Sequence, residues 1–270
     1  MTADKRKFWT VGQIDATGVR GPHEKELADI SKAKHHLFIG IDKDKLEKIV
    51  YEDLGGQIEN IGLSEDWAIT IEMFPEVNIH MAYSYFGDEF GDEIEAEFKF
   101  YFSGEHATWV PGEDSATFID VVMDFIERQI KGKIPFEKTY SKKTEMMEKV
   151  LIQRSEPFKL LKEEDKNKLE SFLGAKVWKT SEGWRIKREM FPKILTEIKY
   201  NDQKGLDISY SGDNLEKISS YHIEFLGIFT INHILRYITV NNLDKDLPDI
   251  CYIMFSRHYT KLKNWQHRTR

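Results

Sequence analysis

Apolar and polar residues alternate along two stretches of the chain that also resemble each other in sequence. Residues 64–83 (SEDWAITIEMFPEVNIHMAY) and 181–200 (SEGWRIKREMFPKILTEIKY) align without a gap at an offset of 117 residues, with nine of twenty positions identical. The identical residues include tryptophan, methionine and phenylalanine, which are uncommon enough to make chance a poor explanation. The alternation predicts strands, and the similarity predicts an internal duplication.

Both copies have the same predicted order of elements: a helix, then strands, then a second helix. The first helices span residues 42–54 and 163–173, and a glycine follows each of them. The predicted strands span residues 67–74, 77–85 and 94–102 in the first copy and 184–191, 194–200 and 206–210 in the second. The first closing helix starts at the N-cap candidate Asp114 and has apolar residues at helical spacing. The second, residues 223–238, is apolar nearly all round, which predicts deep burial.

Helices packed on one face of an antiparallel sheet make an α+β unit. The sequence therefore predicts an α+β fold of two duplicated units, each a helix, a sheet of about four strands and a helix. Four segments follow from this: an N-terminal extension without a repeat partner, the first unit, a lysine-rich linker and the second unit. They span residues 1–35, 36–132, 133–145 and 146–270. Residues 10–21 are predicted as loop and residues 250–255 (ICYIMF) as a closing buried strand, before a basic tail.

Composition limits the class of protein. The 270 residues are 40% hydrophobic, which is enough for a packed core, and the net charge of −7 lowers the expectation of a dedicated nucleic-acid binder. The lone cysteine, Cys251, excludes an internal disulfide and is predicted to be an inert core thiol. The N-terminus lacks a secretory pattern, and the most apolar stretch, residues 223–237, is too short to span a bilayer. We expect a cytoplasmic protein.

An acidic stretch, residues 87–93 (GDEFGDE), joins two predicted strands of the first copy. Its carboxylates could hold Ca²⁺, with the metal ligands Asp88, Glu89, Asp92 and Glu93. The EF-hand spacing is absent, however, and the second copy has NDQKG in this place. We therefore favour an acidic hairpin loop in water and predict no metal ion.

A nuclease is the alternative that would give these acids a catalytic role. Glu97 and Lys99 form a Glu-x-Lys pair on a predicted strand, with Asp88 and Asp92 upstream. This resembles, faintly, the pair that holds Mg²⁺ and stabilises charge in PD-(D/E)xK nucleases. The second copy lacks the pair, and no other catalytic or phosphate-binding motif is present in the sequence. We accordingly predict no cofactor and lean against an enzyme.

Two further features are candidates for binding. Trp67 and Trp184 recur in both copies and could line a groove, although anchoring the core is the favoured role for them. The last twenty residues contain five basic residues and no acidic one, with aromatic residues interleaved. The binding candidates in this tail are Arg257, Lys261, Lys263, Trp265 and Arg268. Docking of the tail within the protein or on a partner protein is preferred to nucleic-acid binding.

Three functions remain open on the sequence alone. The first is a non-enzymatic adaptor-like, chaperone-like or immunity-type protein that binds a protein partner through its paired units and the acidic surface of unit 1. The second is a nucleic-acid-binding protein with duplicated sheets, in which the element order resembles that of the TATA-binding protein and the basic tail contributes. The third is the metal-dependent hydrolase. Any specific activity is expected in the unrepeated parts or between the units.

Overall fold

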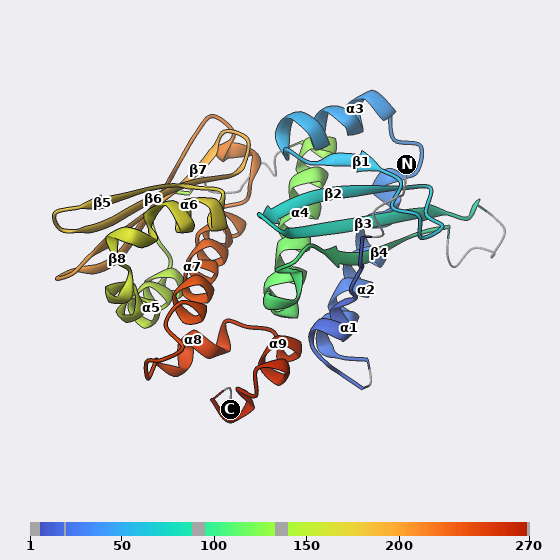
Figure 1. Ribbon diagram of the computed structural model, residues 1–270. Helices are drawn as coiled ribbons and strands as arrows, with labels where there is room; N and C mark the ends of the chain where they lie inside the picture. Colours follow the sequence, from blue (N-terminus) through green and yellow to red (C-terminus); the bar gives the residue numbers. More distant parts are fainter. Residues whose placement is uncertain (1–5, 19, 88–94, 133–139, 269–270) are drawn as a thin grey trace. The chain divides into compact units, whose positions relative to one another are not determined.

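The computed structural model describes residues 6–18, 20–87, 95–132 and 140–268. The chain divides into two compact units, Met1–Lys133 and Ile134–Arg270, which are described separately (Figure 1). Each unit contains a four-stranded antiparallel sheet and a set of helices. The predicted α+β fold of two similar units is therefore confirmed.

Unit 1 has its strands in the order β1-β2-β3-β4. The strands are β1 (Gln57–Glu59), β2 (Trp67–Phe74), β3 (Val77–Tyr85) and β4 (Ala96–Ser103). The α-helices are α1 (Val11–Ile14), α2 (Pro22–Lys34), α3 (Lys43–Lys48) and α4 (Gly112–Lys131). A π-helical turn at Ile49–Asp53 extends α3, and 3-10 turns occupy His35–Phe38 and Ala107–Trp109. We call the side of the sheet that faces α2 and α4 its inner face.

The apolar core of unit 1 lies on the inner face of the sheet, although β2 and β3 also have buried residues on the opposite face. On β2, Ile69 and Ile71 point to the inner face, and the Trp67 ring stacks on Tyr83 with the ring centroids 4.6 Å apart. Phe38 packs edge-on against Phe98 at 4.8 Å. These apolar contacts give unit 1 its core.

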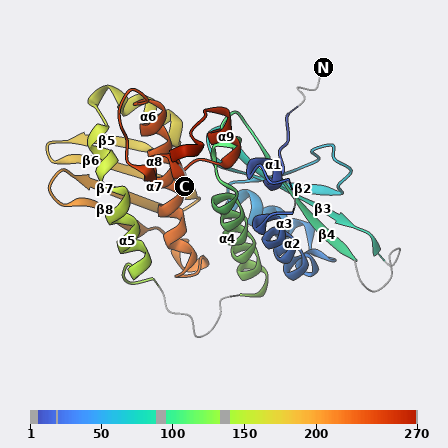
Figure 2. The ribbon, with the colours of Figure 1, turned by 90° about the horizontal axis from the view of Figure 1, so that it is seen from below.

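Unit 2 repeats this arrangement with the strand order β5-β6-β7-β8. The strands are β5 (Lys176–Thr180), β6 (Gly183–Phe191), β7 (Ile194–Asn201) and β8 (Gly205–Ser211). The α-helices are α5 (Glu145–Arg154), α6 (Lys166–Leu173), α7 (His222–Val240), α8 (Asp249–Ile253) and α9 (Arg257–Leu262). Shorter 3-10 turns are Glu156–Leu160, Glu163–Asp165, Leu215–Lys217 and Gln266–Arg268. Helices α5, α6 and α7 lie on one side of the sheet, its inner face (Figures 1 and 2).

Helix α7 forms the centre of unit 2. It is long and apolar enough to cross a membrane, but 89% of its most apolar window is buried inside the structure. Its glycine at 227 brings the helix close to the sheet, because an added Cβ would lie 2.1 Å from the Ile208 side chain. The sequence prediction of a deeply buried helix here is confirmed, and the helix packs as the core of a globular unit.

The duplication is also visible in the backbone of two hairpins, the one formed by β2 and β3 and the one formed by β6 and β7. The register pairs Trp67 with Tyr83 and, identically placed, Trp184 with Tyr200. Both first strands have an irregularity just before the Phe-Pro turn, and the residue after each proline has a positive φ, 64° at Glu76 and 62° at Lys193. The carbonyls of these two residues accept hydrogen bonds from the His106 and Asn214 N–H groups, at 3.0 and 3.2 Å. The retained Phe-Pro sequence therefore specifies the same turn and the same contact with the following segment.

The structural repeat also reaches further upstream than the sequence similarity. The Ser31 hydroxyl on α2 accepts a hydrogen bond from the Phe98 N–H at 2.8 Å, and the Ser155 hydroxyl, which follows α5, accepts one from the Leu206 N–H at 3.1 Å. Phe98 and Leu206 occupy equivalent places in β4 and β8. Helix α2 thus makes the same contact with its sheet as the end of α5 does, a correspondence that the sequence comparison does not show.

Three local predictions need correction. Residues 249–253 form helix α8 instead of a strand, because the Pro248 N-cap precedes a short run that buries Cys251 and Tyr252. The segment 10–21 is not all loop, since the Thr10 side chain caps helix α1. Helix α4 begins at Gly112 after Pro111, two residues before the predicted cap Asp114. Pro111 fixes the extended backbone before the helix, and the Gly112 N–H of the first turn donates to the Asp15 carboxylate at 3.2 Å.

Candidate functional site

The side of each sheet opposite the helices, its outer face, differs between the units. In unit 1 the N-terminal segment, residues 6–9, lies on this face. Trp9 pairs with Phe102 at the β4 edge through two backbone hydrogen bonds of 2.8 and 2.9 Å. The Phe8 ring packs edge-on against His80 and Tyr101, at 5.1 and 6.3 Å. An extended piece of chain therefore covers the outer face of sheet β1–β4.

Beneath this segment a chain of hydrogen bonds crosses the sheet. Arg6 holds the Glu59 carboxylate with two bonds of 2.8 and 2.7 Å. Glu59 accepts from the Thr70 hydroxyl at 2.7 Å, and this hydroxyl also lies 2.8 Å from the His80 Nδ1. The other imidazole nitrogen lies 2.7 Å from the Ser103 hydroxyl. The network satisfies polar groups that the N-terminal segment buries.

A serine, a histidine and a carboxylate connected by hydrogen bonds also occur in enzymes that activate a nucleophile. The burial of this network indicates instead that it stabilises the structure. His80 is fully buried, and burial lowers its pKa to about 4, so the imidazole is neutral near pH 7. Ser103 is only 2% exposed, and its hydroxyl is engaged by His80. Ser103 borders a hollow of about 410 Å³ together with Arg6 and Trp9, but its hydroxyl is held by His80. The network links residues 6–9 to all four strands of the sheet, through Glu59, Thr70, His80 and Ser103.

In unit 2 the equivalent outer face is charged and open. Alignment of the strand registers relates the two faces position by position. Ala68, Thr70, His80, Ala82 and Tyr101 correspond to Arg185, Lys187, Glu197, Lys199 and Ser209. Among the described residues of unit 2, none covers this face in the way that residues 6–9 cover the face of unit 1. We call the residues Lys176, Trp178, Arg185, Lys187, Leu195, Glu197 and Lys199 the open face.

A single carboxylate organises the cations of the open face. Glu197 accepts a hydrogen bond from Arg185, and its oxygens lie 3.5 Å from the Lys187 Nζ and 3.6 Å from the Lys199 Nζ. Burial alone would raise the pKa of Glu197, but the three cations together hold it below its ordinary value. Three positive charges thus surround one negative charge, so the cluster has a net positive charge and can attract anions.

An aromatic groove adjoins the cluster. It has a volume of about 840 Å³ and includes Lys176, Trp178, Lys187 and Leu195 in its lining. Trp178 is 39% exposed and pairs with Arg185 across the strands. Glu170 and Glu189 also border this groove. The groove combines an exposed ring with cations on neighbouring strands.

Charge is divided unevenly between the two units. Residues 1–133 contain 14 Lys or Arg and 27 Asp or Glu, a net charge of −13. Residues 134–270 contain 25 Lys or Arg and 19 Asp or Glu, a net charge of +6. The overall value of −7 hides a basic unit, so the argument from net charge against an anionic ligand does not hold for unit 2.

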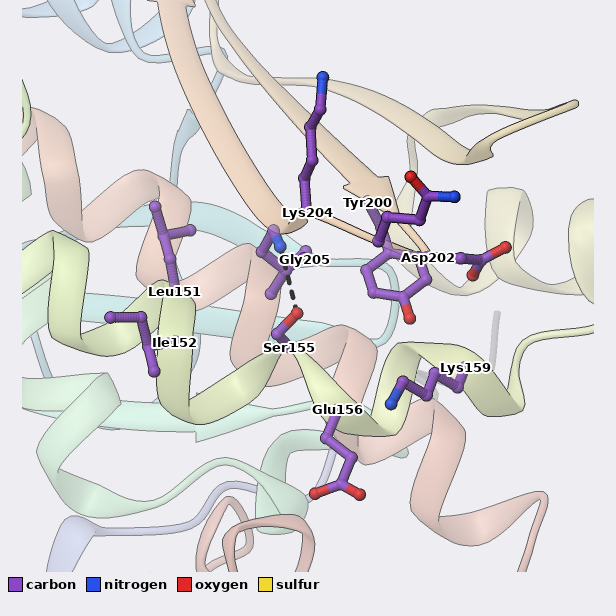
Figure 3. A pocket seen from close by; sticks show the side chains of 11 residues that line it. Leu151, Ile152, Ser155, Glu156, Lys159, Tyr200, Asp202, Lys204 and Gly205 are labelled. Carbon is purple, nitrogen blue, oxygen red and sulfur yellow. Dashed lines mark hydrogen bonds between the residues drawn. The ribbon is translucent and has the colours of Figure 1, made fainter.

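A second hollow of unit 2, about 430 Å³, lies between α5 and the β7–β8 hairpin (Figure 3). Figure 3 shows the Ser155 hydroxyl bonded to the hairpin backbone, while the Glu156 side chain points away from the hairpin. Two carboxylates and two lysines border this hollow, so their charges balance. Its central hydroxyl is already used to hold the hairpin, and we do not assign a ligand to it.

The structure places both predicted tryptophans on inner faces. Trp184 is 2% exposed, and the Lys179 Nζ lies over its ring at 4.8 Å. Trp67 is partly buried in the aromatic cluster with Tyr83 and Phe98. Both rings pack in the cores, which is the role that the sequence favoured over groove lining.

The basic tail folds onto unit 2 itself. Trp265 packs against a buried cluster that includes Leu247, which precedes the tail, and its ring centroid lies 5.3 Å from that of Tyr252. Arg268 donates to the Tyr252 hydroxyl and lies 3.6 Å from Asp246. The remaining predicted tail residues, Arg257, Lys261 and Lys263, are exposed on or beside α9.

The predicted acidic sites are tested only in part. Asp88, Glu89, Asp92 and Glu93 lie outside the described residues. Glu97 and Lys99 are described, and they pair with each other at 2.7 Å. Within the described ranges, no group of three or more His, Cys, Asp or Glu side chains is arranged to hold a metal ion. The hydrolase therefore stays a prediction without support from Glu97 and Lys99.

The sequence of either copy alone does not predict the open face, although a comparison of the two copies indicates it. Polar residues on alternate positions of a strand normally mean a solvated face. Comparing the two copies, however, places Arg185, Lys187 and Lys199 where the first copy has Ala68, Thr70 and Ala82.

No protein-family model, curated protein or solved structure matches the chain. The geometry of the two sheets is therefore the evidence for function.

Proposed function

We propose that the chain is a non-enzymatic binding protein whose unit 2 binds an anionic partner on the open face. The observation that carries the proposal is the contrast between two equivalent surfaces of one duplicated fold. The outer face of unit 1 is neutral at its centre and covered by residues 6–9, whereas the open face is cationic and uncovered by described residues of its unit.

The arrangement of charges supports an anionic partner. Glu197 fixes three cations in one plane of the sheet, so little side-chain entropy is lost when they meet an anion. The net charge of +6 on unit 2 would steer such a partner toward this unit. We place this activity in the cytoplasm, in line with a single, buried, unpaired cysteine.

Unit 1 supports the complementary role that its sequence predicted. Its net charge of −13 would select a basic protein partner, separately from the anionic partner of unit 2. The chain would then join two partners of opposite charge, as an adaptor does.

Retention on an immobilised polyanion tests the proposal. Heparin resin serves as the probe, and the salt concentration at elution is measured for the full chain. The variant Lys176→Gln with Lys187→Gln should elute at clearly lower salt, because it removes two cations from the open face. The matched variant Lys261→Gln with Lys263→Gln removes two cations from the tail and should elute near the wild type. A shift confined to the tail variant would contradict the proposal.

A further inference from the structure

We infer that the anionic partner of the open face is a single-stranded nucleic acid. The inference rests on the proposed function and specifies its ligand. The cations alone would attract an anionic partner of any kind. The exposed Trp178 ring, 39% accessible and beside Arg185 and Lys187, adds an aromatic surface on which a flat base can stack.

The spacing of the groups suits a nucleotide chain. Arg185 and Lys187 occupy alternate positions of β6 and so lie about 6.6–6.8 Å apart along the strand. Lys176 and Trp178 occupy alternate positions of β5, where they pair with Lys187 and Arg185. The face thus presents two cations on β6 and a cation with an aromatic ring on β5. Proteins that bind single strands without strong sequence preference combine a cationic track with stacking rings in this way.

Unit 1 contains an internal precedent for an extended chain on this side of the sheet. Residues 6–9 run over its outer face, the Phe8 ring packs on His80, and Arg6 engages Glu59. In unit 2, Trp178 occupies the position equivalent to Glu59, at the edge of the open face. The fold therefore accepts an extended chain with an aromatic ring across this face. In unit 2 the face is positively charged, so a chain bound there would be negatively charged.

An acidic peptide is the competing partner, and a double-stranded nucleic acid is the competing form. Carboxylates would use the cations but leave the Trp178 indole exposed to water. A duplex hides the faces of its bases, so it would gain phosphate contacts without stacking on the ring. Binding of an acidic peptide or of a duplex would therefore depend less on Trp178 than binding of a single strand.

Fluorescence anisotropy with full-length protein tests the inference. The probes are fluorescein-labelled oligo(U) and oligo(dT) of 12 nucleotides, a 12-base-pair duplex, and a labelled poly-glutamate peptide. Trp178→Ala should weaken binding of the single strands about tenfold or more, and Trp178→Phe should restore most of it. Each phosphate contact contributes about 0.7 to the salt slope for a single strand, so Lys187→Gln should lower the slope by about that amount. Circular dichroism of each variant checks folding.

The outcomes separate the inference from the function on which it rests. Preference for single strands with the stated dependence on Trp178 supports both. Equal binding of oligonucleotide and poly-glutamate, unchanged in Trp178→Ala but weakened by Lys187→Gln, would overturn the nucleic-acid inference while leaving an anion-binding face. Absence of binding to all four probes at low salt would overturn the inference and the proposed function together.

Discussion

His80 and Glu197 occupy equivalent positions on the two outer faces, and their surroundings decide what each residue can be. Under Phe8 the position needs a neutral group that bonds to neighbours on both sides, and an imidazole meets this need. On the open face the same position lies among three cations and suits a carboxylate. The residue type thus follows from what lies over it.

His80 predicts a dependence of stability on pH. Its folded-state pKa is about 4, whereas an unfolded histidine titrates near 6.5. Between these values the unfolded chain binds the additional proton, so the free energy of unfolding should fall as the pH drops from 6.5 to 4. The loss should reach about 3 kcal/mol at most. Urea unfolding across this range checks it.

His80→Gln is the matched control for this measurement. Glutamine keeps hydrogen-bonding groups near Thr70 and Ser103 but does not titrate, so the difference between the two pH profiles isolates the imidazole. Parallel profiles for both proteins would show that His80 does not contribute, and the buried neutral state would then be wrong.

The hairpins show how far the sequence predicts elements. The strands of the repeat were predicted to within two or three residues, because a two-residue period and a Phe-Pro turn are local properties. Helix α8 was misassigned because a short apolar run such as residues 250–255 satisfies either a strand or a buried helix. Helix α5 was missed because the lysine-rich segment before it resembles a linker, and its pairing with α2 depends on contacts between distant residues.

Gly104 predicts a strong effect at the turn between elements. It has a φ of 107°, and an added Cβ would lie 2.2 Å from the backbone oxygen of Glu76. Gly104→Ala should destabilise unit 1 by more than about 3 kcal/mol, because backbone strain adds to a clash that no side-chain movement relieves. Gly212→Ala should do the same in unit 2, where the distance to the Lys193 oxygen is 2.0 Å.

Gly40→Ala separates strain from the clash. Gly40 also has a positive φ, 66°, but nothing lies within 4 Å of an added Cβ, so about 1–2 kcal/mol is expected. Chemical unfolding of the three variants provides the comparison. Similar losses of stability in Gly40→Ala and Gly104→Ala would contradict the close packing of Gly104 against Glu76.

At the scale of the molecule, the chain joins an acidic unit to a basic one. The sequence contains these charges, but it does not reveal which sheet face is covered. That depends on residues 6–9, which lie far from β2 and β3 in the sequence and cover only unit 1. Trp178 likewise belongs to an ordinary alternating strand, and only the fold leaves its ring exposed. The candidate site therefore could not be predicted from either copy alone.

Oxidative footprinting of the full chain, with and without oligo(U), tests the central claim most directly. Mass spectrometry reports the oxidation of each tryptophan, and Trp265 in the tail serves as the internal control. We predict that the oligonucleotide protects Trp178 and leaves Trp265 unchanged, because the ligand stacks on the open face. Protection of Trp265 with full reactivity at Trp178 would place binding on the tail and contradict the account.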